Sequence, residues 1–429
     1  MAENTLKILH TSDWHLGHTL YGRKRYDEFR LFLRWLTQTI REEAAEVLLV
    51  SGDIFDSGLP SNQAQALYYG FLCEAAKGPC RHVVITAGNH DSPSFLDAPQ
   101  PLLQALNVHV VGHARTPEEE VLLLRDGEGR PELIVCAVPF LRDRDLFRAS
   151  PGDTVDDRDA LLAAGMAEHY RRCAERAEQL RAEAASASPN APALPALPVV
   201  AMGHLFAAGG IVGEDDGVRD IRIGSLGQVY ADIFPESFDY VALGHLHRAQ
   251  KVNGREHIRY SGSPLPMGFG EAAQQKKVCL VTCEGRSVSI RQLDIPLFQK
   301  LEKLSGDLPE LEAGLAELSL HGEPVWVEVL FTGPGVASDL RERLLEKAAS
   351  HVEILRVRSA HGLSASLAEG DDSLTLEDMS IHDVFERRLD DLEREAGLEE
   401  EQRRALRETY AEAVRDFQQS KEENAPCAS

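Results

Sequence analysis

Metal-binding side chains follow the ends of several apolar runs in the chain. "LKILHTSDWH" places Asp13 and His15 directly after one such run, and "EVLLVSGD" places Asp53 after another. In α/β sheets the carboxyl ends of the strands share one edge, where ligands bind, so side chains far apart in sequence can converge there. The full set of these candidate ligands is Asp13, His15, Asp53, Asn89, His204, His245 and His247.

This donor set fits divalent metal ions. Imidazole binds ions such as zinc, iron and manganese, carboxylate oxygen favours harder ions, and the absence of thiolate ligands is unlike a structural zinc site. The set is too large for one tetrahedral ion and fits two ions that share a bridging carboxylate. Such ions, about 3.5–4 Å apart, clamp the attacking and leaving oxygens of an in-line displacement and activate a water. Two divalent ions against Asp13 and Asp53 leave a charge of about +2, which attracts a phosphate diester.

A single histidine after a strand is usually a core or surface residue. Here the pattern recurs at five strand ends, which argues against coincidence. The other histidines keep the ordinary interpretation, except that His18 lies in the loop beside the predicted centre.

The elements that must position these residues alternate between buried strands and amphipathic helices. Residues 26–44 carry apolar side chains at helical spacing, and residues 157–184 predict one long helix. This helix precedes an Ala/Pro-rich stretch at 185–198, which we interpret as a loop insertion. The apolar runs over 256–294 follow one another without helices and predict antiparallel strands. The pattern indicates a layered α/β domain with mixed sheets over residues 1–295.

The pattern changes after Pro296. Alternating helices and strands predict a small α/β domain over residues 296–362, followed by a polar linker. Residues 376–420 predict two helices, the first opened by a capping box of Ser380 and Asp383. Each helix carries an apolar stripe, which favours docking on a partner over docking on its own domain.

Composition limits the environment and the partners. The chain has 429 residues and a net charge of −24, with no apolar run long enough for a membrane span and no signal-like start. Its seven cysteines include no CxxC pair, so we expect buried free thiols in a reducing cytosol and a cytoplasmic protein. The acidic charge alone argues against nucleic acid. Screening over about 8 Å nevertheless lets a local positive site outweigh it.

The motif series D-x-H, G-D-x-x-D, G-N-H-D, G-H and G-H-x-H resembles that of the calcineurin-like metallophosphoesterases. The longer stretches "HTSDWHLGH", "SGDIFDSGLPS", "DYVALGHLHRAQ" and "HIRYSGSPLP" are similar to the D subunits of bacterial SbcCD nucleases. The similarity extends to "PVWVEVLF" and "SIHDVFERRL", and so spans nearly the whole chain. It implies an α/β/β/α sandwich with a small α/β capping domain and C-terminal helices.

The resemblance also implies individual roles. One ion would be held by Asp13, His15, Asp53 and His247, and the other by Asp53, Asn89, His204 and His245. His90 resembles the general acid that protonates the departing ribose oxygen. Asp91 would support the site from outside the ligand set. Asp56 stands where archaeal and eukaryotic relatives carry a second histidine, which leaves its role open. Manganese is the usual metal of the family, although the spacing does not select it over iron, cobalt or zinc.

The resemblance implies a DNA nuclease of repair and recombination, with 3′–5′ exonuclease activity on duplex ends and endonuclease activity on hairpins and single strands. Its expected partner is an SbcC-type coiled-coil ATPase bound by the C-terminal helices. A homodimer within a heterotetramer would form through helices near 62–72 and 95–106. Arg23, Lys24 and Arg25 either grip DNA phosphates at the rim or form the solvated start of the next helix.

Two other functions use the same fold. A phosphodiesterase for small substrates such as cyclic nucleotides would need neither the small domain nor the tail. A non-catalytic scaffold would lack ligands or the acid, whereas His90 and every ligand position are present here.

Overall fold

The computed structural model describes residues 5–146, 155–186, 197–207, 231–333 and 340–359. The chain divides into two compact units, 1–360 and 361–429. The helices predicted at 376–420 lie outside the described residues, as does most of the 185–198 insertion. None of the helices in the described ranges is long and apolar enough to cross a membrane.

The first of two six-stranded mixed sheets has the order β14-β13-β1-β4-β5-β6. Four parallel strands come from the N-terminal part of the chain, and an antiparallel hairpin completes the sheet beside β1. The strands are β1 (Thr5–Thr11), β4 (Val47–Ser51), β5 (His82–Thr86), β6 (Val108–Val111), β13 (Lys277–Glu284) and β14 (Ser287–Asp294).

The second sheet has the order β11-β12-β10-β9-β8-β7. Its strands are β7 (Val121–Arg125), β8 (Pro131–Ala137), β9 (Val199–His204), β10 (Tyr240–Gly244), β11 (Gln250–Val252) and β12 (Arg255–Tyr260). The antiparallel arrangement predicted for 256–294 is confirmed for β13 and β14. It is wrong for β12, which runs parallel to β10 and antiparallel only to the short edge strand β11. Run length and composition alone carry no signal for strand direction.

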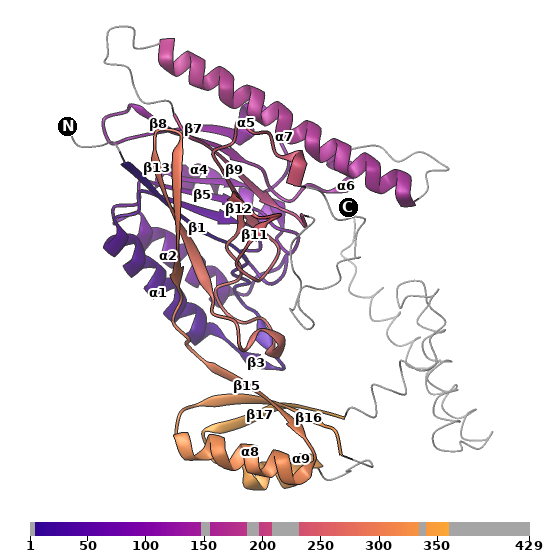
Figure 1. Cartoon of the computed structure of the whole chain (residues 1–429). Helices are drawn as coiled ribbons and strands as arrows, with labels where there is room; N and C mark the ends of the chain where they lie inside the picture. Colours follow the sequence, from indigo (N-terminus) through magenta and orange to yellow (C-terminus); the bar gives the residue numbers. More distant parts are fainter. Residues whose placement is uncertain (1–4, 147–154, 187–196, 208–230, 334–339, 360–429) are drawn as a thin grey trace, which may run out of the picture. The chain divides into compact units, whose positions relative to one another are not determined.

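Helices cover the outer faces of both sheets (Figure 1). The helices α1 (Tyr26–Glu43) and α2 (Asn62–Ala75) pack on the first sheet through one buried cluster that includes Phe29 and Phe32. The long helix α7 (Val155–Ser186) packs on the second sheet through another cluster. A third cluster joins the inner faces of the two sheets. The predicted α/β/β/α sandwich is confirmed.

Short elements fill the connections. They are β2 (Thr19–Leu20), β3 (Arg23–Lys24), α3 (Pro93–Asp97), α4 (Gln100–Gln104), α5 (Pro117–Glu120), α6 (Asp143–Leu146), η1 (Ala231–Ile233) and η2 (Phe269–Glu271). The six cysteines of the described ranges are all free thiols, as predicted, and five of them are buried; the prediction of burial is wrong for Cys73, which is exposed on α2.

A small parallel sheet follows the sandwich. Its strands are β15 (Lys300–Gly306), β16 (Val325–Phe331) and β17 (Val352–Ser359), with α8 (Leu308–His321) and α9 (Leu340–Lys347) on one face (Figure 1). Asp307 begins α8 with a capping box to Glu310, because both side chains satisfy amide groups that the first helical turn leaves unpaired. These elements have their own buried core, which includes Leu315 and Val327.

Two glycines allow the strand ends to approach one another. A Cβ on Gly244 would overlap the carbonyl oxygen of Ser51, and one on Gly88 would overlap the side chain and backbone of Asp53. Both contacts lie at the edge where the candidate ligands follow their strands. Neither glycine has a positive φ, so backbone conformation does not require glycine here. What requires it is the close packing of the strand ends, which leaves no space for a side chain.

Gly244→Ala should lower the free energy of unfolding by about 1–3 kcal/mol or more, because the added methyl must displace backbone. Chemical denaturation measures this change. Gly127→Ala is the matched control, since its Cβ would meet nothing within 4 Å. Equal stability of the two variants would contradict the steric argument.

Candidate metal centre

Four of the predicted ligands have left-handed backbone. Their φ angles are 53° at Asp13, 47° at His15, 49° at Asp53 and 102° at His245. Such conformations cost of order 1–3 kcal/mol each in residues other than glycine and cluster at functional sites. Backbone hydrogen bonds hold two of them, since Asp13 N donates to Gly52 O at 3.0 Å and His15 N donates to Asp53 O at 2.9 Å.

One group of ligands forms around the first strand end. Ligand atoms of Asp13, His15 and His247 lie within 4.8 Å of one another, and all three residues are buried. The Nε2 atoms of His15 and His247 are 3.2 Å apart, although 232 positions separate the residues in sequence. Two sheets therefore supply this group, the first through β1 and the second through the loop after β10.

A second group forms beside the first. Asp13, Asp53 and His204 also place ligand atoms within 4.8 Å of one another. Asn89 Oδ1 lies 3.0 Å from His204 Nε2 and 3.2 Å from His245 Nδ1. The structure thus brings all of the predicted ligands together.

Asp53 lies between the two groups. Its Oδ2 is 3.5 Å from His15 Nε2 and 3.3 Å from His204 Nε2. Its Oδ1 accepts a hydrogen bond from the backbone N–H of His90 at 2.9 Å. This is the position that a carboxylate shared by two cations must occupy.

The charges of the centre favour cations. Asp13 and Asp53 are buried, and no lysine or arginine of the described residues forms an ion pair with either. Burial alone would raise the pKa of Asp53, but the imidazole of His204 holds it well below its usual value. Burial lowers the pKa of His15 well below its usual value, so its imidazole is neutral, the form that binds metal. Oxygen and nitrogen donors around a buried carboxylate fit divalent ions.

Comparison with known proteins assigns the centre to a family. The calcineurin-like phosphoesterase family matches residues 6–249, and the family described as the type 5 capsule protein repressor C-terminal domain matches residues 297–393. The chain is 35% identical over 391 residues to the D subunit of the SbcCD nuclease of Escherichia coli, covering 90% of this chain and 92% of that protein. The chain belongs to the SbcCD nuclease D-subunit family of calcineurin-like phosphoesterases.

Other members of this family are similarly related. The SbcCD nuclease D subunit of Rhodobacter capsulatus is 36% identical, with 74% of this chain and 77% of that protein covered. The corresponding protein of Bacillus subtilis is 34% identical, with 64% and 66% covered. Membership in a phosphoesterase family makes the chain a divalent-metal enzyme of phosphoester hydrolysis.

His90 stands at the rim of the phosphoesterase centre. Its ring packs edge-on against that of His15, with 4.9 Å between centroids. Its Nδ1 lies 3.1 Å from the carbonyl oxygen of Asp56, which favours a proton on Nδ1 and turns Nε2 away from the backbone. This carbonyl contact fixes the orientation of the ring beside the ligands.

Asp56 and His18 form a pair beside His90. The Oδ1 of Asp56 lies 2.9 Å from His18 Nδ1 and 3.7 Å from His15 Nδ1. Burial alone would raise the pKa of Asp56, but His18 holds it below its usual value. The carboxylate lies beside His15 without a hydrogen bond to it, and His18, which the sequence places in the loop next to the centre, contacts the site through Asp56.

Asp91 supports the backbone of the site. Its carboxylate is buried and accepts hydrogen bonds from the amides of Ile54 at 3.1 Å, Phe55 at 2.9 Å and Gly88 at 2.9 Å. These bonds join the loop after β4 to the loop after β5, which carry Asp53 and Asn89.

Glu271 orients a ligand and was missed by sequence reasoning. This buried carboxylate places Oε1 3.2 Å from His247 Nδ1 and receives Lys276 Nζ at 2.5 Å on Oε2. A carboxylate behind a metal-binding histidine fixes its tautomer and raises its basicity. The surrounding stretch "MGFGEAAQQKK" has no distinctive motif, so only the fold shows the contact.

The three basic residues after the first motif have different surroundings. Arg25 is 1% exposed, donates to both carboxylate oxygens of Glu28 and donates to Pro266 O at 2.5 Å. The prediction that it contacts DNA or lies on a solvated surface is wrong, because a buried carboxylate and carbonyl already occupy its guanidinium. Arg23 is exposed and pairs with Glu353, and Lys24 is exposed.

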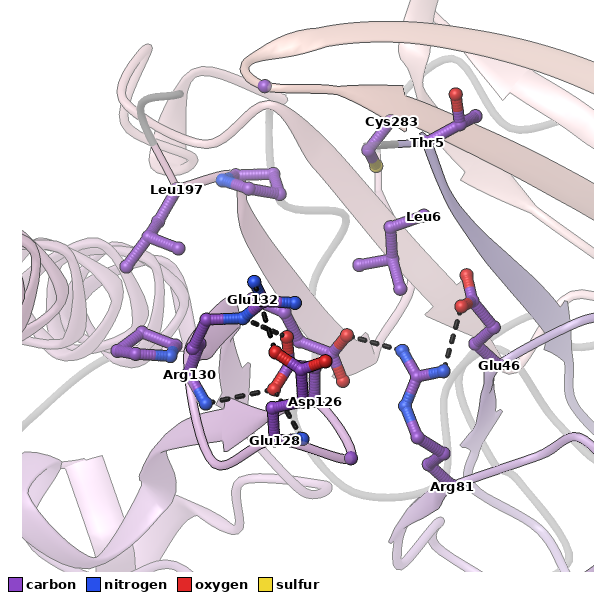
Figure 2. Close-up of a pocket in the computed structure, with 14 residues that line it drawn as sticks. Thr5, Leu6, Glu46, Arg81, Asp126, Glu128, Arg130, Glu132, Leu197 and Cys283 are labelled. Carbon is purple, nitrogen blue, oxygen red and sulfur yellow. Dashed lines mark hydrogen bonds and ion pairs between the residues drawn. The ribbon is translucent and has the colours of Figure 1, made fainter. Parts of the chain in front are cut away.

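Another hollow lies at the opposite edge of the two sheets, where the strands begin (Figure 2). Arg81 donates to Glu46 at 2.8 Å and pairs with Glu132, and Arg130 pairs with Asp126 at 2.7 Å. Because carboxylates already engage both guanidinium groups, this hollow is not a second phosphate site.

Glu271→Gln should weaken manganese binding about 10- to 100-fold, because an amide is a poorer acceptor for the His247 ring. Calorimetric titration of the metal-free protein measures the affinity, and Glu284→Gln at an exposed position is the control.

A second variant separates orientation from stability. Glu271→Gln leaves the Lys276 ammonium buried without its carboxylate, which destabilises the fold. Glu271→Gln/Lys276→Met removes that charge, so stability should recover while manganese binding stays weak. If manganese affinity recovered together with stability in the double variant, Glu271 would not be needed to orient His247.

Proposed function

We propose that this chain is a DNA nuclease subunit of an SbcCD-type complex and hydrolyses phosphodiesters with two divalent metal ions. The observation that carries the proposal is the convergence of seven metal-binding side chains beside His90, from five strand ends in two sheets. The names of the D-subunit relatives support a nuclease activity.

The bound ions would supply Lewis acidity and an activated water for in-line displacement. Asp13, His15, Asp53 and His247 would hold one ion, and Asp53, Asn89, His204 and His245 the other. The chain's own contribution is to fix these donors with backbone and carboxylate contacts. His90, held by the Asp56 carbonyl, donates a proton to the departing ribose oxygen.

The proposed substrate is DNA, with 3′–5′ degradation of duplex ends and cleavage of hairpins and single strands. Manganese is the proposed ion because the family resemblance implies it, and the carboxylate and carboxamide oxygens of the centre are donors that suit it. Lys24 on β3 is the remaining candidate for a phosphate contact, and Arg23 joins it only by exchanging Glu353 for a phosphate.

The proposed partner is a coiled-coil ATPase of the SbcC type, bound by helices in residues 376–420. A homodimer within a heterotetramer would use the surface of α2, α3 and α4. Exposed apolar side chains near these helices, Leu59 at 92% and Leu102 at 76%, support an interface there.

One experiment tests the proposal against its alternatives. Purified protein with Mn²⁺ is incubated separately with end-labelled duplex, a DNA hairpin and a small phosphodiester. We expect DNA cleavage that a chelator abolishes. Fast hydrolysis of the small diester with intact DNA would support the small-substrate phosphodiesterase, and no hydrolysis of any substrate would support the scaffold.

His90→Ala should reduce the rate of DNA cleavage about 10²- to 10⁴-fold, because only the proton donor is removed. Manganese affinity should remain that of the wild type, since His90 is outside the ligand set. His257→Ala on β12 is the control histidine. Cleavage at the wild-type rate by His90→Ala would rule out the acid role.

Truncation after Ala365 should leave a folded manganese nuclease that no longer co-purifies with the ATPase. The reason is that the apolar stripes of 376–420 are removed while every proposed ligand is kept. Affinity co-purification and the DNA assay measure the two properties. Retained co-purification would move the partner site to another part of the chain.

A further inference from the structure

A second group of metal-binding side chains lies on the outer side of the second sheet. Glu120 ends α5, and His169 and Cys173 lie on α7. A carboxylate oxygen, an imidazole nitrogen and the sulfur all lie within 4.8 Å of one another. His169 and Cys173 are four residues apart and so share one face of the helix. None of the three belongs to the centre around Asp53.

The Glu120 carboxylate is fully buried. Its Oε1 accepts the backbone N–H of Arg115 at 2.6 Å, and its Oε2 lies 2.6 Å from His169 Nε2 and 3.7 Å from Cys173 Sγ. Across the described residues, no lysine or arginine side chain pairs with this carboxylate. A buried carboxylate is strongly destabilising unless positive charge and hydrogen bonds compensate it.

The cysteine side of the group is also buried. Cys173 and Cys136 of β8 are both buried, and the Cys136 thiol donates to the carbonyl oxygen of Cys173 at 3.8 Å. Burial raises the pKa of both thiols, so neither ionises by itself near neutral pH. A metal ion deprotonates a coordinating thiol outright.

We propose that Glu120, His169 and Cys173 bind a zinc ion, with water in the fourth position. Carboxylate, imidazole and thiolate together suit this borderline-soft ion, which takes ligands at about 2.0–2.3 Å. Around such an ion, ligand atoms stand roughly 3.3–3.8 Å apart, and Cys173 already has this separation from Glu120. His169 must withdraw by about 1 Å, and its side chain, 12% exposed, reaches the surface only in part, so this movement is the one rearrangement that the site requires.

The ion would fasten α5 to α7 over β8. It would take no part in phosphodiester hydrolysis, because its ligands lie on the outer side of the sheet and the phosphoesterase ligands follow the strand ends. The inference therefore stands or fails independently of the proposed nuclease function.

Cobalt(II) titration of the metal-free, full-length protein tests the site. Thiolate coordination to cobalt gives a near-ultraviolet charge-transfer band, which the centre around Asp53 cannot give because its ligands are nitrogen and oxygen only. We expect the band to saturate at one cobalt per chain and to disappear on addition of zinc. No band on the wild-type protein would overturn the proposal, and this outcome needs no variant to fold.

Variants identify the ligands. Cys173→Ser should abolish the band, and His169→Gln should weaken cobalt binding at the site tenfold or more. Cys73→Ser is the matched control, since this thiol is exposed on α2 and could bind cobalt adventitiously. A band lost in Cys73→Ser and kept in Cys173→Ser would overturn the assignment, as would unchanged affinity in His169→Gln.

Discussion

The carboxylate of Asp53 is the point on which the centre depends. One oxygen faces His15 and His204 at 3.5 and 3.3 Å, and the other accepts the His90 amide at 2.9 Å. His204 ends a strand of the second sheet, whereas Asp53, His15 and His90 follow strands of the first. The two sheets must therefore stay in close contact at this edge, and Gly244 of β10 permits it because a Cβ there would strike the carbonyl oxygen of Ser51 on β4.

Backbone strain and support are concentrated at the same edge. Asp13, His15, Asp53 and His245 adopt left-handed φ angles that cost free energy, and amide and carboxylate contacts around them hold these angles in place. His245 N, for example, donates to Asp13 Oδ1 at 2.8 Å. The strained backbone lowers the stability of the fold, but it holds the donor atoms in position before any cation binds.

The strongly acidic chain and a phosphodiester substrate are compatible because the relevant field is local. Screening limits the influence of distant surface carboxylates to about a Debye length. Near the centre, two bound divalent ions would outweigh the charges of Asp13 and Asp53 and make the local potential positive. Arg25 shows that a basic residue need not contribute to a positive surface. It is buried, and Glu28 neutralises its charge between β3 and α1.

The sequence by itself determined the ligand types, the strands that carry them and the helical layers, because each depends on local periodicity and on residues at strand ends. It also determined the family, through motifs that span the chain. Only the tertiary structure decided how β12 pairs, which ligands carry strained backbone, that Glu271 stands behind His247, and that Glu120, His169 and Cys173 meet. These features join residues that have no local pattern in common, and strand order and side-chain packing set their distances.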